Sequence, residues 1–133
     1  MSFGYQILGF GSGVVAAADL SIAWGGDRGC FAGGNDASGR INIIEYITIS
    51  TTGNTTDFGD LSANRVNMGA LSSGSRGVWA GGNLNGTEKN IMEYITFASL
   101  GNVTDFGDLS GDRRQCSGVS NGTRGCFGGG HKD

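Results

Sequence analysis

The sequence predicts an all-β protein made of repeated units, each folding into a small antiparallel sheet. The first observation is a period of 48 residues, because one pattern of arginine, glycine, an apolar pair and further glycines fills residues 28–34, 76–82 and 124–130. The second is that 15 of 21 positions are identical between residues 42–62 and 90–110. The third is that the chain has 27 glycines and no proline, and its glycines recur at fixed places. Recurring glycines indicate turns and close backbone approach, and a long period indicates stacked units.

Four short strands are expected in each unit. Residues 42–49 are rich in β-branched and aromatic side chains, and residues 90–97 repeat them. The segments from arginine to double glycine form a second strand type, with Cys30, Val78 and Cys126 on one face and Phe31, Trp79 and Phe127 on the other. Shorter candidates are residues 56–58 with 104–106, and 65–71 with 113–119. Four antiparallel strands in about 48 residues are the pattern of a β-propeller blade, so we expect such blades over residues 28–133 and almost no helix.

Charge and cysteine content narrow the expected partners. The formal net charge is −3 and the basic residues are scattered singly, so we expect no nucleic-acid partner. Three cysteines make a disulfide framework improbable. Cys30 and Cys126 occupy the repeat position of Val78, which indicates a small buried apolar site.

Residues 1–27 depart from the repeat and are expected to form an N-terminal arm that completes a neighbour's blade or docks onto a larger particle, the alternative being a loosely ordered leader. No Lys or Arg precedes Arg28, so the positive region of a secretory signal is missing. The apolar run at residues 13–18 is too short to span a bilayer. We therefore expect no membrane partner and synthesis in a reducing cytoplasm.

The order of arginine, apolar pair, double glycine, Glu-Tyr and aromatic residue resembles the kelch repeat over roughly residues 28–130. Gly33-Gly34 and Gly81-Gly82 match the kelch glycines, and Tyr46 and Tyr94 match its tyrosine. Phe58 and Phe106 stand where kelch repeats have Trp, and the spacing from tyrosine to this aromatic residue is wider than usual. The Tyr-Ile-Thr and Asp-Phe-Gly-Asp-Leu segments also resemble degenerate kelch-type repeats in structural proteins of tailed phages, especially marine ones. That resemblance implies a virion structural protein, assembled in the host cytoplasm.

Counting units predicts self-association. About 2.8 units of 48 residues fit in this chain, whereas propellers close at roughly four to eight blades. An incomplete array leaves strand edges and apolar faces uncovered. Identical chains placed head to tail form a closed ring if the rotation suits and a filament if it does not. We expect a cyclic homo-oligomer, most simply a trimer, with a filament as the alternative.

A buried ion pair is expected in each unit. Glu45 and Glu93 lie within apolar strands, and a buried carboxylate needs a cationic partner. The regularly spaced arginines, among them Arg65 and Arg113, are the available cations. Because the pair recurs with the repeat, a structural role is favoured over a catalytic acid. The remaining structural positions are the double glycines, which include Gly129 and Gly130 in the third unit.

No catalytic, cofactor or metal site is expected. Repeats this alike favour a structural or binding role, since a catalytic site is normally built once. The aspartate pairs at positions 57 and 60 and at 105 and 108 indicate Asx turns, with calcium binding as an alternative.

Ligand contacts, if present, are expected in the loops that differ most between units. These are residues 35–40, from Asn35 to Arg40, and residues 83–89, from Asn83 to Lys89. The sequence thus favours a non-enzymatic virion component, a capsid-decoration or tail-fibre protein that binds other virion proteins through residues 1–27 and a host-surface glycan through these loops. The alternative is a lectin-like propeller module, and an enzyme is the weakest hypothesis.

Overall fold

The computed structural model describes residues 27–132, and within that range every regular element is a β-strand in an antiparallel sheet. The prediction of an all-β chain without helix is confirmed for these residues. The expected arm at residues 1–27 lies outside the described part of the chain, apart from its last residue.

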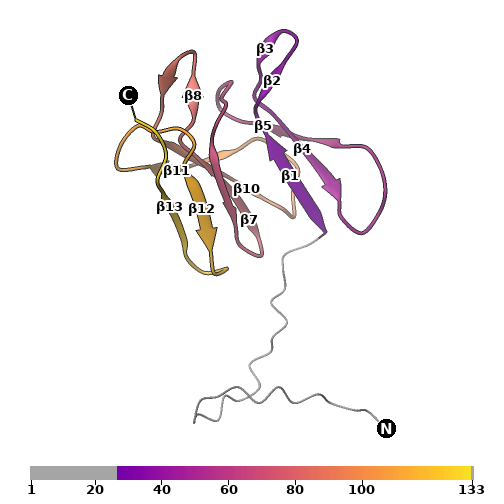
Figure 1. Cartoon of the computed structure of the whole chain (residues 1–133). Coiled ribbons are helices and arrows are strands. Elements are labelled where there is room, and N and C mark those ends of the chain that lie inside the picture. Colours follow the sequence, from indigo (N-terminus) through magenta and orange to yellow (C-terminus); the bar gives the residue numbers. More distant parts are fainter. Residues whose placement is uncertain (1–26, 133) are drawn as a thin grey trace, which may run out of the picture.

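Three sheets follow one another along the chain, and Figure 1 shows them side by side in chain order, from indigo to yellow. The first sheet has the order β1-β4-β5, with strands Arg28–Ala32, Ile43–Thr48 and Thr56–Asp60. The second sheet has the order β6-β7-β10-β11, with strands Gly69–Ser72, Arg76–Ala80, Ile91–Thr96 and Thr104–Asp108. The third sheet pairs β12 (Ser117–Ser120) with β13 (Gly125–Gly128). The second sheet therefore shows the whole repeat, and the other two show parts of it.

The register repeats exactly between the first two sheets. Arg28 pairs with Thr48 and Cys30 with Tyr46, just as Arg76 pairs with Thr96 and Val78 with Tyr94. A shift of register, of the kind a β-bulge makes, follows Ile44 in β4 and Met92 in β10. The repeated sequence therefore adopts the same local geometry in both sheets, including the shift of register.

Two strand boundaries differ from the prediction. The strands expected at residues 65–71 and 113–119 begin only at Gly69 and Ser117, because the residues before them form the connection between sheets. That connection touches the next sheet through single bridges, Val66 with Asn83 and Arg114 with His131.

Two short hairpins replace the expected irregular loops. They are β2 (Asn35–Asp36) with β3 (Gly39–Arg40) and β8 (Asn83–Leu84) with β9 (Thr87–Glu88), and both project from the same end of the molecule (Figure 1). Asn85 and Gly86 join β8 to β9 with φ angles of 52° and 91°, as a two-residue turn between antiparallel strands requires.

The apolar core lies between the first and second sheets. Its fully buried members are Ile44, Phe58, Leu61, Trp79 and Ile95. Because alternate residues of a strand face opposite sides, each sheet has two faces. We name each face by the neighbouring sheet toward which it points. The following face, toward the next sheet along the chain, carries Cys30 and Tyr46 in the first sheet and Val78 and Tyr94 in the second. The preceding face carries Phe31 and Glu45 in the first sheet and Trp79 and Glu93 in the second. The core joins the following face of the first sheet to the preceding face of the second.

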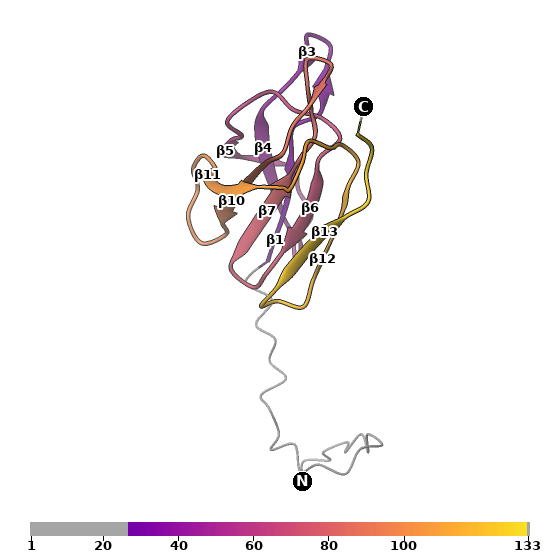
Figure 2. The same ribbon diagram turned by 90° about the vertical axis from the view of Figure 1, so that its left-hand side faces the viewer.

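The second and third sheets approach through glycines. A Cβ atom on Gly69 would come within 2.6 Å of the Cys116 carbonyl oxygen, and one on Gly118 within 2.4 Å of the Ala70 carbonyl oxygen. Figure 2 shows the yellow third sheet lying along β6. Only residues without a side chain allow backbones to lie this close.

Candidate functional site

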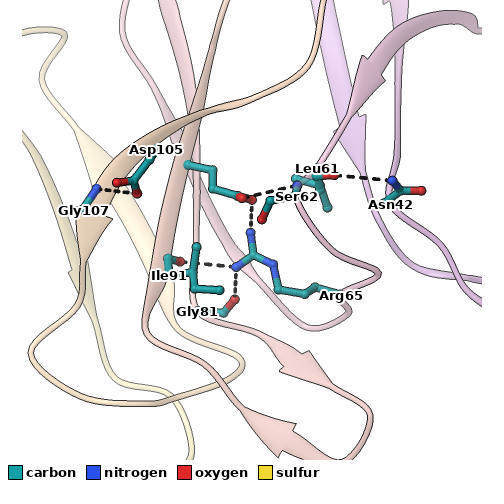
Figure 3. A network of polar contacts seen from close by, with 9 residues as sticks. Asn42, Leu61, Ser62, Arg65, Gly81, Ile91, Asp105 and Gly107 are labelled. Atoms are coloured by element: carbon teal, nitrogen blue, oxygen red, sulfur yellow. Dashed lines mark hydrogen bonds and ion pairs between the residues drawn. The ribbon is translucent and has the colours of Figure 1, made fainter.

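Arg65 lies in the connection between the first and second sheets and binds both. Its carbonyl oxygen accepts a hydrogen bond from Gly34 N at 3.1 Å, on the side of the first sheet. Its Nη1 donates to the carbonyl oxygens of Gly81 at 2.8 Å and Ile91 at 3.3 Å in the second sheet (Figure 3). Its Nη2 donates to the carboxylate of Glu93, which also accepts from Ser62 N. One residue thus links two sheets, through its backbone on one side and its side chain on the other.

This ion pair is fully withdrawn from water. Arg65 has no exposed surface and Glu93 is 2 % exposed. Removing two charges from water is costly, and the attraction between them offsets that cost only where further hydrogen bonds satisfy both groups. The two carbonyl oxygens that accept from the guanidinium and the amide that donates to the carboxylate meet most of that condition, while Arg65 Nε has no hydrogen-bond partner. The prediction of a buried structural ion pair is confirmed for Glu93.

Arg113 repeats the geometry of Arg65 at the next junction, but not the ion pair. Its carbonyl oxygen accepts from Gly82 N at 2.9 Å, and its Nη1 donates to the Gly129 carbonyl oxygen at 3.0 Å. Within residues 27–132 no carboxylate pairs with it, and the side chain is half-buried.

Glu45, at the other end of the array, is a carboxylate that lacks an arginine partner among the described residues. It is exposed, its carboxylate accepts from Thr55 Oγ1 at 2.9 Å, and no arginine of the described residues pairs with it. The position one period before Arg65 is Ala17, so the repeat lacks an arginine there. Among residues 27–132 the expected buried pair at Glu45 is therefore not formed: the pairing joins neighbouring units, and each end of the described array has one member of it.

The double glycines make room for these arginines. Gly33 and Gly81 have φ angles of 65° and 68°, and a Cβ atom on them would lie 2.3 and 2.4 Å from the carbonyl oxygens of Arg65 and Arg113. Gly130 approaches the Arg114 carbonyl oxygen in the same way, whereas Gly129 meets nothing within 4 Å. Positive φ and close approach both exclude other residues at the first two positions.

Both repeat tyrosines form the same cluster with an arginine and a phenylalanine. Tyr46 meets Phe58 edge-on at 6.0 Å between ring centroids, and the Arg28 guanidinium lies 4.8 Å over its ring. Tyr94 meets Phe106 at 5.7 Å, with the Arg76 guanidinium at 4.5 Å. Such contacts stabilise by about 0.5–1.5 kcal/mol each. The tyrosines therefore organise the following face of each sheet.

The two clusters differ in what covers them. Arg28 Nη1 also donates to the Phe97 carbonyl oxygen of the second sheet at 2.6 Å, and Phe58 is 2 % exposed. Arg76 is exposed, and Phe106 is 50 % exposed. An open groove lies there, lined by Leu71, Arg76, Val78, Phe106 and Arg124. The groove occupies the place that β10 and the following loop fill at the first junction.

A second ion pair lies outside the repeat pattern. Arg114 Nη1 donates to Glu88 Oε1 at 2.5 Å, and the Glu88 side chain is nearly buried. The equivalent residues one period earlier are Val66 and Arg40, so no recurrence marks this pair in the sequence.

The candidate ligand positions are spread over both hairpins and do not converge. Asn35 is exposed and Arg40 half-buried. Asn83 is 3 % exposed, with its side-chain oxygen accepting from Gly86 N at 2.8 Å. Lys89 binds Gly82 O and Arg113 N through its backbone. Asn83 is thus a structural residue, and the other three do not form one pocket.

One aspartate of the Asp-x-x-Asp pairs adopts an Asx turn. Asp105 Oδ1 accepts from Gly107 N at 3.0 Å (Figure 3). Among residues 27–132 no group of three or more His, Cys, Asp or Glu is placed to hold a metal ion. This part of the chain also contains no helix that could cross a membrane.

The three cysteines have unequal surroundings and form no disulfide. Cys116 is buried and Cys126 exposed, while Cys30 packs against the core. Burial raises the pKa of the Cys30 thiol above its ordinary value, and Arg28 opposes part of that shift. The expected small buried site therefore exists at Val78 and, in part, at Cys30.

No protein-family model matches the chain, and no curated protein matches its sequence.

Proposed function

We propose that this protein is a non-enzymatic structural protein whose chains assemble into an oligomeric β-propeller, with each sheet serving as a blade. The observation that carries the proposal is the uncovered apolar surface at both ends of the array. Phe31, Ile43 and Ile49 are 58 %, 42 % and 65 % exposed on the preceding face of the first sheet. Phe106 and Val119 are 50 % and 66 % exposed at the opposite end.

Repeat equivalence explains why this surface signifies assembly. Phe31 corresponds to Trp79, which is 6 % exposed because the first sheet covers it. Phe106 corresponds to Phe58, which the second sheet covers. The same residue types are thus buried between sheets and exposed at the ends. Surfaces built to be buried favour association of copies.

The resemblance to tailed-phage kelch-type repeats supports placing the assembly in a virion, as a capsid-decoration or tail component. A ring of about six blades from three chains matches the size range of known propellers. Attachment to other virion proteins would then involve residues 1–27, all but the last of which lie outside the described residues.

The lectin-like alternative loses its main support. It needs Trp79 at the surface as a sugar platform, but Trp79 is 6 % exposed and belongs to the core. The exposed aromatic residues that remain, Phe31 and Phe106, are the ones that repeat equivalence assigns to contact between sheets.

Negative-stain electron microscopy of the purified full chain tests the proposal. We expect closed rings of uniform diameter with a central channel. Single small particles at micromolar concentration would contradict it. Open filaments would show that the chains associate without closing a ring, which is the alternative assembly.

A further inference from the structure

We propose that a second copy of this chain docks against the second sheet of the first, so that Arg113 of one copy pairs with Glu45 of the next. This inference deepens the proposed function and rests on it. The junction between the first and second sheets serves as its template, because each half of that junction recurs, unpaired, at one end of the array.

Charge complementarity carries the argument. Arg65 pairs with Glu93, one sheet further along the chain. Arg113 repeats Arg65 in both its backbone and its Nη1 contacts, and has no carboxylate within residues 27–132. Glu45 repeats Glu93 in its strand position and has no arginine there. One end of the array thus presents a cation and the other an anion, at equivalent positions.

The loop after β4 is the second observation. In the loop after β10, Gly101 N donates to the Phe58 carbonyl oxygen at 2.8 Å, and Asn102 Oδ1 accepts from Asp60 N at 3.0 Å. A Cβ atom on Gly59 would lie 2.3 Å from the Gly101 carbonyl oxygen, so this loop lies directly on β5.

The loop after β4 keeps just these docking residues. Its Gly53-Asn54 repeats Gly101-Asn102, whereas the four residues before the glycine differ. A Cβ atom on Gly107, the equivalent of Gly59, meets nothing within 4 Å, so within residues 27–132 no loop lies against this glycine. The Gly-Asn sequence therefore recurs in the loop after β4, and Gly107 leaves room for such a loop at the opposite end of the array.

A single register satisfies these contacts. The incoming first sheet completes a four-stranded sheet with β12, and its β1 takes the place of β13, since both strands occupy the same repeat position. β13 is exposed apart from Phe127, while β1 packs on the core through Cys30 and Ala32, so β13 is the strand that yields. The carbonyl oxygen of Gly33 in the incoming chain then replaces that of Gly129, its repeat equivalent, as the acceptor for Arg113 Nη1. If the second copy docked one sheet further along the array, Arg113 and Glu45 could not pair.

Charge reversal tests the pairing, with mass in solution as the readout and thermal unfolding as the check on folding. Arg113→Glu and Glu45→Arg should each weaken assembly more than about tenfold, as expected for like charges at a desolvated contact. The double variant should restore assembly. Asp36→Arg, a reversal at an exposed carboxylate in the β2–β3 hairpin, should assemble as the unmodified chain does.

A matched amide pair gives an independent test. Asn54→Ala should weaken assembly and leave the unfolding temperature of the isolated chain unchanged. Asn102→Ala should lower that temperature, because it removes a contact within the chain.

The outcomes separate the two proposals. If the unmodified chain is monomeric at every concentration, the proposed function fails. If it assembles, and the single reversals assemble equally well or the double variant is not restored, the Arg113–Glu45 contact is overturned and the proposed function stands.

Discussion

Arg65 and Glu93 form an ion pair inside the protein although they belong to different repeat units, 28 residues apart in the chain. Arg65 is bound by its backbone to one sheet and by its side chain to the next. Cohesion between units therefore depends on a polar contact as well as on the apolar core. This explains why the arginine recurs while the apolar residues around it vary.

Breaking this pair should be costly. Glu93→Gln should lower the free energy of unfolding by about 3–5 kcal/mol, because it leaves the Arg65 charge buried and unpaired. Chemical denaturation at low protein concentration measures the loss. Glu45→Gln is the matched control at the equivalent exposed position and should change the value little. Equal losses in both variants would show that the ion pair does not stabilise the junction.

Alanine substitution should destabilise the chain more at Phe58 than at Phe106, its repeat equivalent. Phe58→Ala should cost about 3–5 kcal/mol, as for other buried aromatic residues. Phe106→Ala in the isolated chain should cost roughly half of that or less, because half of its surface is already in water. Thermal unfolding of both variants compares them, and a larger loss for Phe106→Ala would refute the assignment of the core.

Gly118 should be intolerant of a side chain. Gly118→Ala would place a Cβ atom 2.4 Å from the Ala70 carbonyl oxygen, so β12 must move away from β6, at about 1–3 kcal/mol. Faster hydrogen exchange at the amides of β12 and β13 would report the separation. Gly128→Ala, in the partner strand, meets nothing within 4 Å and serves as the control. Unchanged exchange in Gly118→Ala would mean that the third sheet does not pack on the second.

Stability should fall in alkaline solution through Cys30. Burial raises the pKa of this thiol above its ordinary value, so the folded chain holds the proton at pH values where the unfolded chain releases it. The free energy of unfolding therefore decreases as pH rises beyond about 9, until the folded thiol also ionises. Cys30→Val, the residue found at position 78, should remove this component. A pH profile identical in Cys30→Val would exclude Cys30 as its source.

Much of the fold could be read from the sequence because the repeats confirm one another. The strand expected over residues 42–49 is β4, within a residue at each end, and its repeat is β10. A pattern of β-branched residues that occurs twice, with turn residues at the same offsets, specifies the same sheet twice. The strands assigned from Arg65 and Arg113 began too early, because extended backbone in a connection has the same local pattern as a strand.

The candidate site could be predicted only in part. Recurrence identified Glu93 as a buried carboxylate and Arg65 as one of the available cations, but it could not show which arginine pairs with which carboxylate, or that the pair joins neighbouring units. Because the pair joins neighbouring units, Glu45 and Arg113 have no ion-pair partner among residues 27–132. The ion pair of Arg114 with Glu88 was missed because neither residue recurs.

The mass of the full chain in solution, followed by sedimentation over a wide range of dilution, tests the central claim most directly. We expect a discrete oligomer, with three chains in the simplest ring. On dilution it should dissociate into single chains, which breaks the Arg113–Glu45 contact between copies. A stable single chain at the highest concentration, with its end faces open to water, would contradict the account.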